Sequence, residues 1–121
     1  GKIIVGGIDA ITSEYASDFD LGYAYDCGKY ASSMAPALIL IVNAVNGSRL
    51  TAADGNAPRV GSGYWIAKSK EDLENMLKAD NATDGYCFGK KVIERYRGCT
   101  FAEFEKLCMA DYETAKMVRD E

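Results

Sequence analysis

The sequence predicts an α+β fold, in which a small, mostly antiparallel sheet from the N-terminal half packs against two or three C-terminal helices. Charge is the first observation, because residues 1–60 carry ten charged side chains and residues 61–121 carry twenty-two. Periodicity is the second, since β-branched and alternating segments fill the first half and helical spacing fills the second. No linker or internal repeat interrupts the chain, so we expect residues 1–121 to form a single domain.

Three segments are predicted strands. The run "KIIVGGI" predicts a buried strand over residues 2–6, with its aliphatic side chains in the core and its two glycines in the following turn. Large and small residues alternate in "LGYAYDC", residues 21–27, which indicates a strand with a tyrosine-lined face. The segment "GYWIA", residues 63–67, predicts a further short strand.

The apolar run at residues 37–45 fits either a buried strand or a buried helix. Pro36 suits the first turn of a helix. The β-branched content of the run favours strands, and Asn46-Gly47 is a good two-residue hairpin turn. We therefore expect a hairpin here, with the helix as the alternative.

The second half predicts helices. Ser69 and Asp72 resemble a capping box at the start of a helix over residues 70–79, and "GKKVIERYRG" predicts a short helix between two glycines. Thr100 with Glu103 predicts the start of a long C-terminal helix. Its apolar stripe would consist of Phe101, Phe104, Leu107, Cys108, Tyr112, Ala115 and Val118.

The segment "IVGG" at residues 4–7 resembles the N-terminus of activated trypsin-like serine proteases. Such an enzyme needs a Ser-His-Asp triad, in which an imidazole takes the proton of the serine. The chain contains no histidine, so this activity is excluded. No spacing of other residues singles out a catalytic set, and we predict no catalytic residues.

The segment "DNATDGYCFGKK" resembles the calcium loop of EF-hand proteins. Asp80 and Asp84 fit the first and fifth loop positions. Ala82 and Lys91 stand where the third and twelfth positions need oxygen ligands, so an ordinary turn is the better interpretation. No metal site and no cofactor are predicted.

The four cysteines, Cys27, Cys87, Cys99 and Cys108, contain no closely spaced pair of the kind that zinc sites use. We expect a cytoplasmic protein with reduced thiols. The alternative is a secreted protein with disulfides, which two matches to the N-glycosylation pattern would suit. The longest apolar run is shorter than the roughly 18 to 20 residues of a membrane-spanning helix, so no membrane segment is expected.

Tyrosines favour a protein interface in the first half. Tyrosine and tryptophan give a large contact area at a small entropy cost, which suits interfaces. The predicted surface consists of Tyr23, Tyr25, Tyr30 and Trp65. The alternative is that these rings pack on the core.

Cations are concentrated in "GKKVIERYRG". Lys91, Arg95 and Arg97, with Tyr86 and Phe88 for stacking, could receive a phosphate-bearing small ligand or a nucleotide. The alternative is a solvated helix face. The net charge of −4 disfavours nucleic acid as a partner.

Together these features predict a small non-enzymatic protein that acts by protein–protein interaction. Accessory, inhibitor and immunity-type proteins of mobile elements have a similar size and acidity. The partner would be another protein chain, including a second copy in a dimer, and an anionic small molecule is the alternative ligand.

Overall fold

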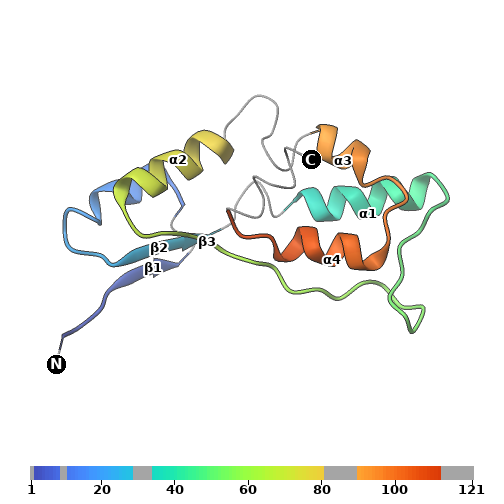
Figure 1. Ribbon diagram of the computed structural model, residues 1–121, viewed down its shortest axis with the longest axis horizontal. Coiled ribbons are helices and arrows are strands. Elements are labelled where there is room, and N and C mark those ends of the chain that lie inside the picture. Colours follow the sequence, from blue (N-terminus) through green and yellow to red (C-terminus); the bar gives the residue numbers. More distant parts are fainter. Residues whose placement is uncertain (1, 9–10, 29–33, 81–89, 113–121) are drawn as a thin grey trace.

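A computed structural model describes residues 2–8, 11–28, 34–80 and 90–112 of the chain. Its elements form two groups that lie side by side along the long axis (Figure 1). The first group consists of the strands β1 (Gly6–Ile8), β2 (Tyr25–Gly28) and β3 (Trp65–Ala67), the 3-10 helix η1 (Ser13–Ser17) and the helix α2 (Lys70–Asp80). The second consists of the helices α1 (Ala35–Val45), α3 (Lys90–Arg95) and α4 (Phe101–Met109).

The predicted α+β class is confirmed. The sheet has the order β1-β2-β3, and it is mixed, because β1 runs parallel to β2 while β3 runs antiparallel to it. Figure 1 shows α2 lying over one face of this sheet. Among the described residues, no helix combines the length and the apolar content that crossing a membrane requires.

One face of the sheet forms the core of the first group. Trp65 and Ala67 of β3 are buried there, whereas Ile66 between them is exposed. They pack with side chains from α2, from the segment around η1 and from the residue that follows α4: Ile11, Leu73, Met76 and Ala110. Among the described residues, η1 and α2 therefore cover one side of the sheet.

The predicted strand over residues 2–6 is wrong in its position. Strand β1 begins at Gly6, and Ile3 and Ile4 are 85% and 71% exposed instead of buried. The reason is that β2 is short and reaches only the later part of this run, so the earlier residues extend beyond the sheet. The glycines lie in the strand and not in a turn. At Gly6 a side chain would overlap the ring of Tyr25, which lies against this glycine.

Residues 35–45 form the helix α1, so the favoured strand prediction for this run is wrong. Pro36 lies in the first turn, where its missing N–H is harmless. Gly47 has a φ of 78° and ends the helix: its N–H bonds to Ala44 O, and the N–H of Ser48 bonds to Asn43 O at 2.8 Å. A hairpin turn and a helix end both use a glycine with positive φ, which is why the dipeptide pattern alone misled.

The structure confirms the predicted start signals of the helices α2 and α4. Ser69 accepts a hydrogen bond from the backbone N–H of Asp72 at the start of α2. Thr100 and Glu103 form a reciprocal capping box at the start of α4. Helix α4 is shorter than predicted, because the backbone leaves the helical conformation at Ala110. The last two residues of the predicted stripe, Ala115 and Val118, lie outside the described residues.

The core of the second group lies where α1 packs against α3 and α4. Its buried members are Ile39, Leu50, Val92, Tyr96, Phe104, Leu107 and Cys108. At its centre the amide of Asn43 donates to Tyr96 O at 3.0 Å and accepts from the N–H of Gly98 at 2.8 Å. The side chain of Asn43 is 1% exposed, the bond to Tyr96 is buried, and the bond to Gly98 is partly buried. They attach α1 to the turn between α3 and α4.

We predict that Asn43→Ala lowers the free energy of unfolding by about 1–3 kcal/mol, because it leaves the buried carbonyl of Tyr96 and the partly buried N–H of Gly98 without their partner. Urea unfolding followed by circular dichroism measures the change. The matched control is Asn46→Ala, an exposed asparagine at the end of the same helix, which should change stability little. Equal stability of the two variants would contradict this role for Asn43.

Candidate functional site

The sheet has an uncovered apolar face. Successive side chains of a strand point to opposite sides, so the residues that alternate with the buried ones share the other face. The register places Ile8, Cys27 and Ile66 in one row across all three strands, and Tyr25 beside Gly6 in the next row. We call Ile8, Tyr25, Cys27 and Ile66 the open sheet face. It carries no charged side chain.

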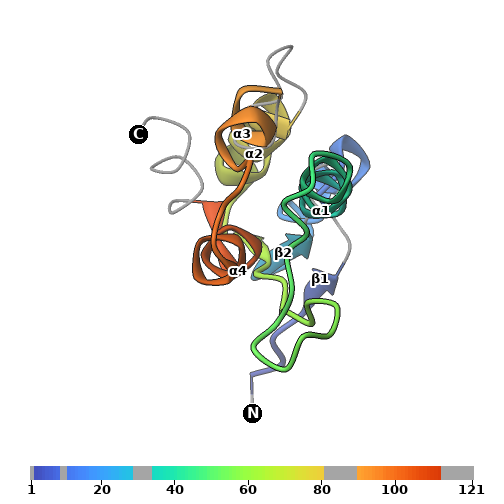
Figure 2. The ribbon, with the colours of Figure 1, turned by 90° about the vertical axis from the view of Figure 1, so that its right-hand side faces the viewer.

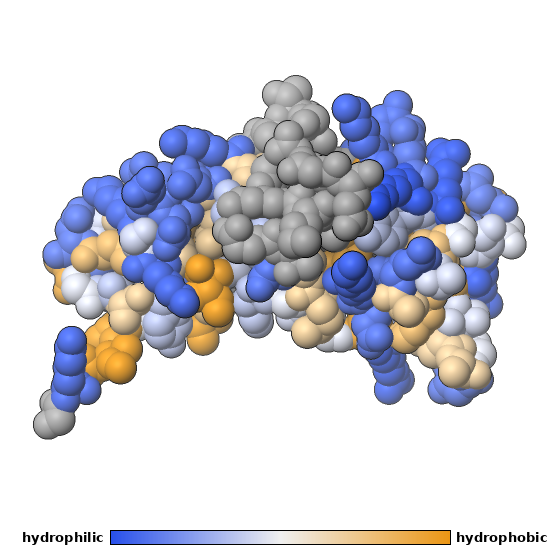
Figure 3. All heavy atoms as spheres, in the orientation of Figure 1, coloured by the Kyte–Doolittle hydropathy of each residue, from blue (hydrophilic) through white to orange (hydrophobic). Residues whose placement is uncertain are grey.

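The open sheet face is accessible. Ile8 is 71% exposed, Ile66 49% and Tyr25 38%, and Cys27 is partly buried. Figure 3 shows apolar surface gathered over the N-terminal arm and below the sheet, on the side away from α2. The sheet thus presents an apolar surface where soluble proteins usually place polar residues.

A hollow of about 400 Å³ adjoins this face at β3. On the side of β3 it is lined by Tyr64, Ile66 and Lys68, and α2 contributes Asp72, Asn75 and Met76. Asp111 and Tyr112 complete the lining, and the ring of Tyr112 packs edge-on against Trp65 at 5.1 Å. The hollow has room for a side chain of a partner that covers Ile66.

Strand β1 forms one edge of the sheet. The segment that precedes β1, residues 2–5, is exposed, and it is apolar apart from Lys2. Natural edge strands are usually protected by charge, proline or a bulge, because their backbone groups can pair with another chain. Within residues 2–8 a single lysine is the only such protection.

Of the predicted interface residues, the structure brings one to the open sheet face. Tyr25 lies on it, and Tyr23 is partly buried just before β2. Trp65 is 1% exposed and packs in the core on the opposite side of the sheet. Tyr30 lies outside the described residues. Ile8 and Ile66 were missed, although the alternation around a buried Trp65 could have indicated Ile66.

Asp26 lies under the open sheet face, on the covered side of β2. Its side chain is fully buried, and neither carboxylate oxygen has a hydrogen-bond partner among the described residues. Burial raises the pKa of this carboxyl above its ordinary value, and the negative charge of Asp18 raises it further. A weak interaction with the backbone N–H of Gly7 offsets part of the shift. The ionised form of Asp26 therefore opposes folding.

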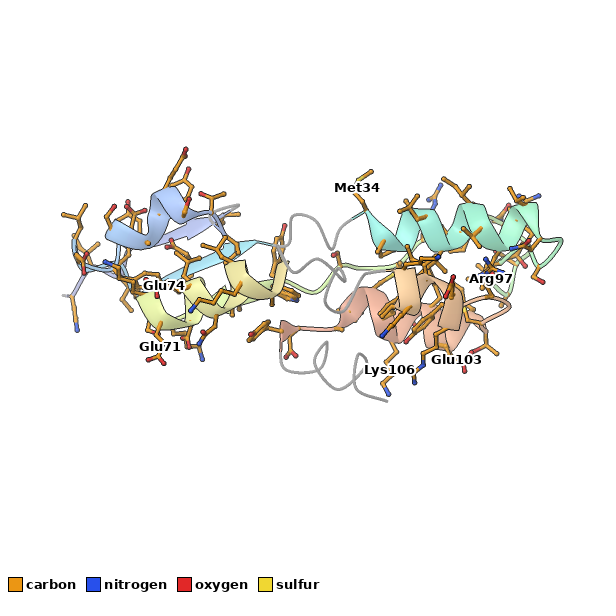
Figure 4. The ribbon with its side chains drawn as sticks, turned by 90° about the horizontal axis from the view of Figure 1, so that it is seen from above. Met34, Glu71, Glu74, Arg97, Glu103 and Lys106 are labelled. Atoms are coloured by element: carbon orange, nitrogen blue, oxygen red, sulfur yellow. The ribbon has the colours of Figure 1, made fainter. Side chains whose placement is uncertain are left out.

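The predicted cationic residues are only partly brought together. Arg95 and Arg97 line a hollow of about 340 Å³ with Lys106, which the sequence did not single out. Lys91 is exposed on α3 but does not line it, and Tyr86 and Phe88 lie outside the described residues. Figure 4 shows Lys106 beside Glu103 on α4, on the side away from α1.

Glu103 reduces the positive charge of this cationic hollow. Its carboxylate accepts hydrogen bonds from the backbone and hydroxyl of Thr100, which lower its pKa. It therefore stays ionised and already occupies the N-terminus of α4, where an anionic ligand would otherwise bind.

Neither the cysteines nor the acidic residues form a metal centre in the described part of the chain. The S–H of Cys27 donates to Gly7 O at 3.4 Å, Cys99 accepts from Asn43, and Cys108 is buried in the helical core. No disulfide joins these three residues. Most of the loop that resembles an EF-hand lies outside the described residues.

Comparison with protein-family models, with curated proteins and with solved structures found no match for this chain.

We predict that Asp26→Asn stabilises the protein at pH 7 by about 1 kcal/mol or more, because an amide avoids burying a charge. Since the pKa is raised on folding, the folded chain holds a proton that the unfolded chain loses. The stability of the wild type should thus fall as pH rises above about 3.8, and the variant should lack this component.

Urea unfolding at several pH values measures both effects. The matched control is Asp54→Asn, because Asp54 is exposed and its pKa is lowered by hydrogen bonds from Asn56. This control should gain no stability at pH 7. A stability difference between wild type and Asp26→Asn that does not change with pH would contradict the assignment.

Proposed function

We propose that this protein is a small non-enzymatic binding protein, and that it holds an extended segment of another protein chain on the β1 edge and the open sheet face. The observation that carries the proposal is the row formed by Ile8, Cys27 and Ile66 across the three strands. Both isoleucines are exposed, so the row is a continuous apolar strip that water covers in the unbound protein.

The strand edge supports an extended partner. A segment added beside β1 would form main-chain hydrogen bonds with it, and its alternate side chains would lie on the open sheet face. The partner residue next to Ile8 would continue the apolar row. The residue two positions along would lie beside Gly6, where the ring of Tyr25 is within reach because no side chain covers the glycine.

The absence of charge on the open sheet face supports an apolar partner segment. A charged side chain placed beside Ile8 would lose its hydration without gaining an ion pair from the open sheet face. The charged residues Lys68 and Asp72 lie at the other end of the row, in the hollow beside Ile66. We therefore expect alternating aliphatic or aromatic residues in the partner segment, with polar residues pointing to the other side.

The phosphate-bearing ligand stays a prediction for the cationic hollow. Arg97 and Lys106 are exposed at that hollow, and Glu103 lies among them. Solvated charges of this kind contribute little to binding unless several converge on one ligand. The apolar strip on the sheet is the more unusual feature of a soluble surface, so we place the main function there.

The test is a selection of short random peptides, displayed on phage, against the purified full chain, with the Ile8→Arg chain as counter-selection. We predict that enriched peptides have alternating apolar residues. Isothermal titration calorimetry with an enriched, synthesised peptide should show at least about tenfold weaker binding to Ile8→Arg, because the arginine interrupts the apolar row.

The matched control is Tyr15→Arg. Tyr15 is an exposed aromatic residue of η1, which lies on the covered side of the sheet, so its replacement should leave peptide affinity unchanged. Equal affinity of folded Ile8→Arg and wild type, or enrichment of peptides without apolar alternation, would refute the proposal.

A further inference from the structure

Helix α1 is apolar on all sides. Residues 35–45 contain no charged side chain, and a helix of this composition is normally buried all round. The structure covers one side only, where Ala35, Ile39 and Asn43 face the helical core. Figure 2 shows α1 at the outside of the helical group, and Figure 4 shows Met34 at its start pointing away from the protein.

The uncovered side of α1 is a regular stripe. Met34, Leu38, Ile41 and Val45 are between 45% and 81% exposed. Their spacing of four, three and four residues places them on one line along the helix, opposite the buried Asn43. This is the spacing of residues that form the seam between two paired helices. We call these four residues the α1 stripe.

We infer that the α1 stripe pairs with the α1 stripe of a second copy of this chain, with the two helices antiparallel about a twofold axis. In this arrangement Leu38 would lie beside Ile41 of the other copy, and Met34 beside Val45. Such an interface is self-complementary, because the twofold axis makes every contact between the two copies occur twice. The inference does not depend on the function proposed for the sheet.

The helix dipole supports the antiparallel direction. The first turn of α1 has no acidic residue and its last turn has no basic residue, so neither end of the dipole is compensated by a side chain of the helix. An antiparallel copy places the positive end of one helix near the negative end of the other. Residues 35–45 bring no charge into the seam, and Arg49 is the charged residue that lines the adjoining hollow.

A hollow beside the α1 stripe provides a place for a side chain of the second copy. It measures about 230 Å³ and is mostly apolar. Ile41 and Ala44 of α1 form one wall, and Leu50, Ala57 and Pro58 form the other. A residue at one of the stripe positions of the partner could insert there, as knobs fit into holes in paired helices.

The size of the stripe predicts a weak dimer. Eleven helical residues span about 16 Å, which is too short to bury the roughly 800 Å² per partner of a typical stable interface. We expect a dissociation constant on the order of micromolar or weaker.

Sedimentation equilibrium of the full chain over a range of concentrations tests the inference. We expect a monomer–dimer equilibrium in the wild type, and about a hundredfold weaker association in Leu38→Lys. Each variant dimer would lose the burial of two leucines and would bring two charges into the seam. The matched control is Met109→Lys on α4, which replaces a similarly exposed apolar residue and should dimerise like the wild type.

Two further measurements separate the alternatives. Ile8→Lys should leave dimerisation unchanged, because Ile8 belongs to the open sheet face; its loss of dimerisation would assign the interface to the sheet and overturn the inference. A wild-type protein that stays monomeric at every concentration would also overturn the inference. Binding of the monomer to vesicles of phosphatidylcholine and phosphatidylglycerol would then assign the α1 stripe to a membrane surface instead. Circular dichroism confirms that each variant is folded.

Discussion

In the described part of the chain, helices cover one side of the three-stranded sheet, and the apolar surface on the other side depends on this constraint. Helix α2 and the segment around η1 cover Trp65, Ala67 and Asp26. Since strand side chains alternate, covering these residues leaves Ile8, Tyr25 and Ile66 on the other side. The apolar surface therefore follows from the geometry of the strands and is not a collection of unrelated exposed residues. This surface is the reason that we propose binding of a protein segment rather than of a phosphate-bearing ligand.

The helical group shows the same one-sided burial. Asn43 holds the turn between α3 and α4 through one buried and one partly buried hydrogen bond, and this contact orients the inner side of α1 toward the core. Because the helix is apolar all round, its outer side then exposes the apolar residues of the α1 stripe. The sheet and α1 thus offer two separate apolar surfaces, and neither requires the chemistry of an active site.

The helix-start signals could be predicted from the sequence, whereas features that depend on distant parts of the chain could not. Thr100 and Glu103 interact with each other across one helical turn, so the start of α4 could be predicted without knowing the fold. The position of β1 depends on how far β2 reaches, and the state of residues 37–45 depends on α3 and α4, which lie far along the chain. For the candidate site, Tyr25 was predicted, but choosing Ile66 over Trp65 required knowing which face α2 covers.

Amide hydrogen exchange, measured by NMR on the complex with a selected peptide, tests the central claim most directly. We predict that the amides of Gly6, Gly7 and Ile8 exchange much more slowly in the complex than in the unbound protein, because a new strand pairs with this edge. Unchanged exchange in β1, with protection appearing only at α1 or at the turn around Arg97, would contradict the claim that the sheet edge and its open face are the binding site.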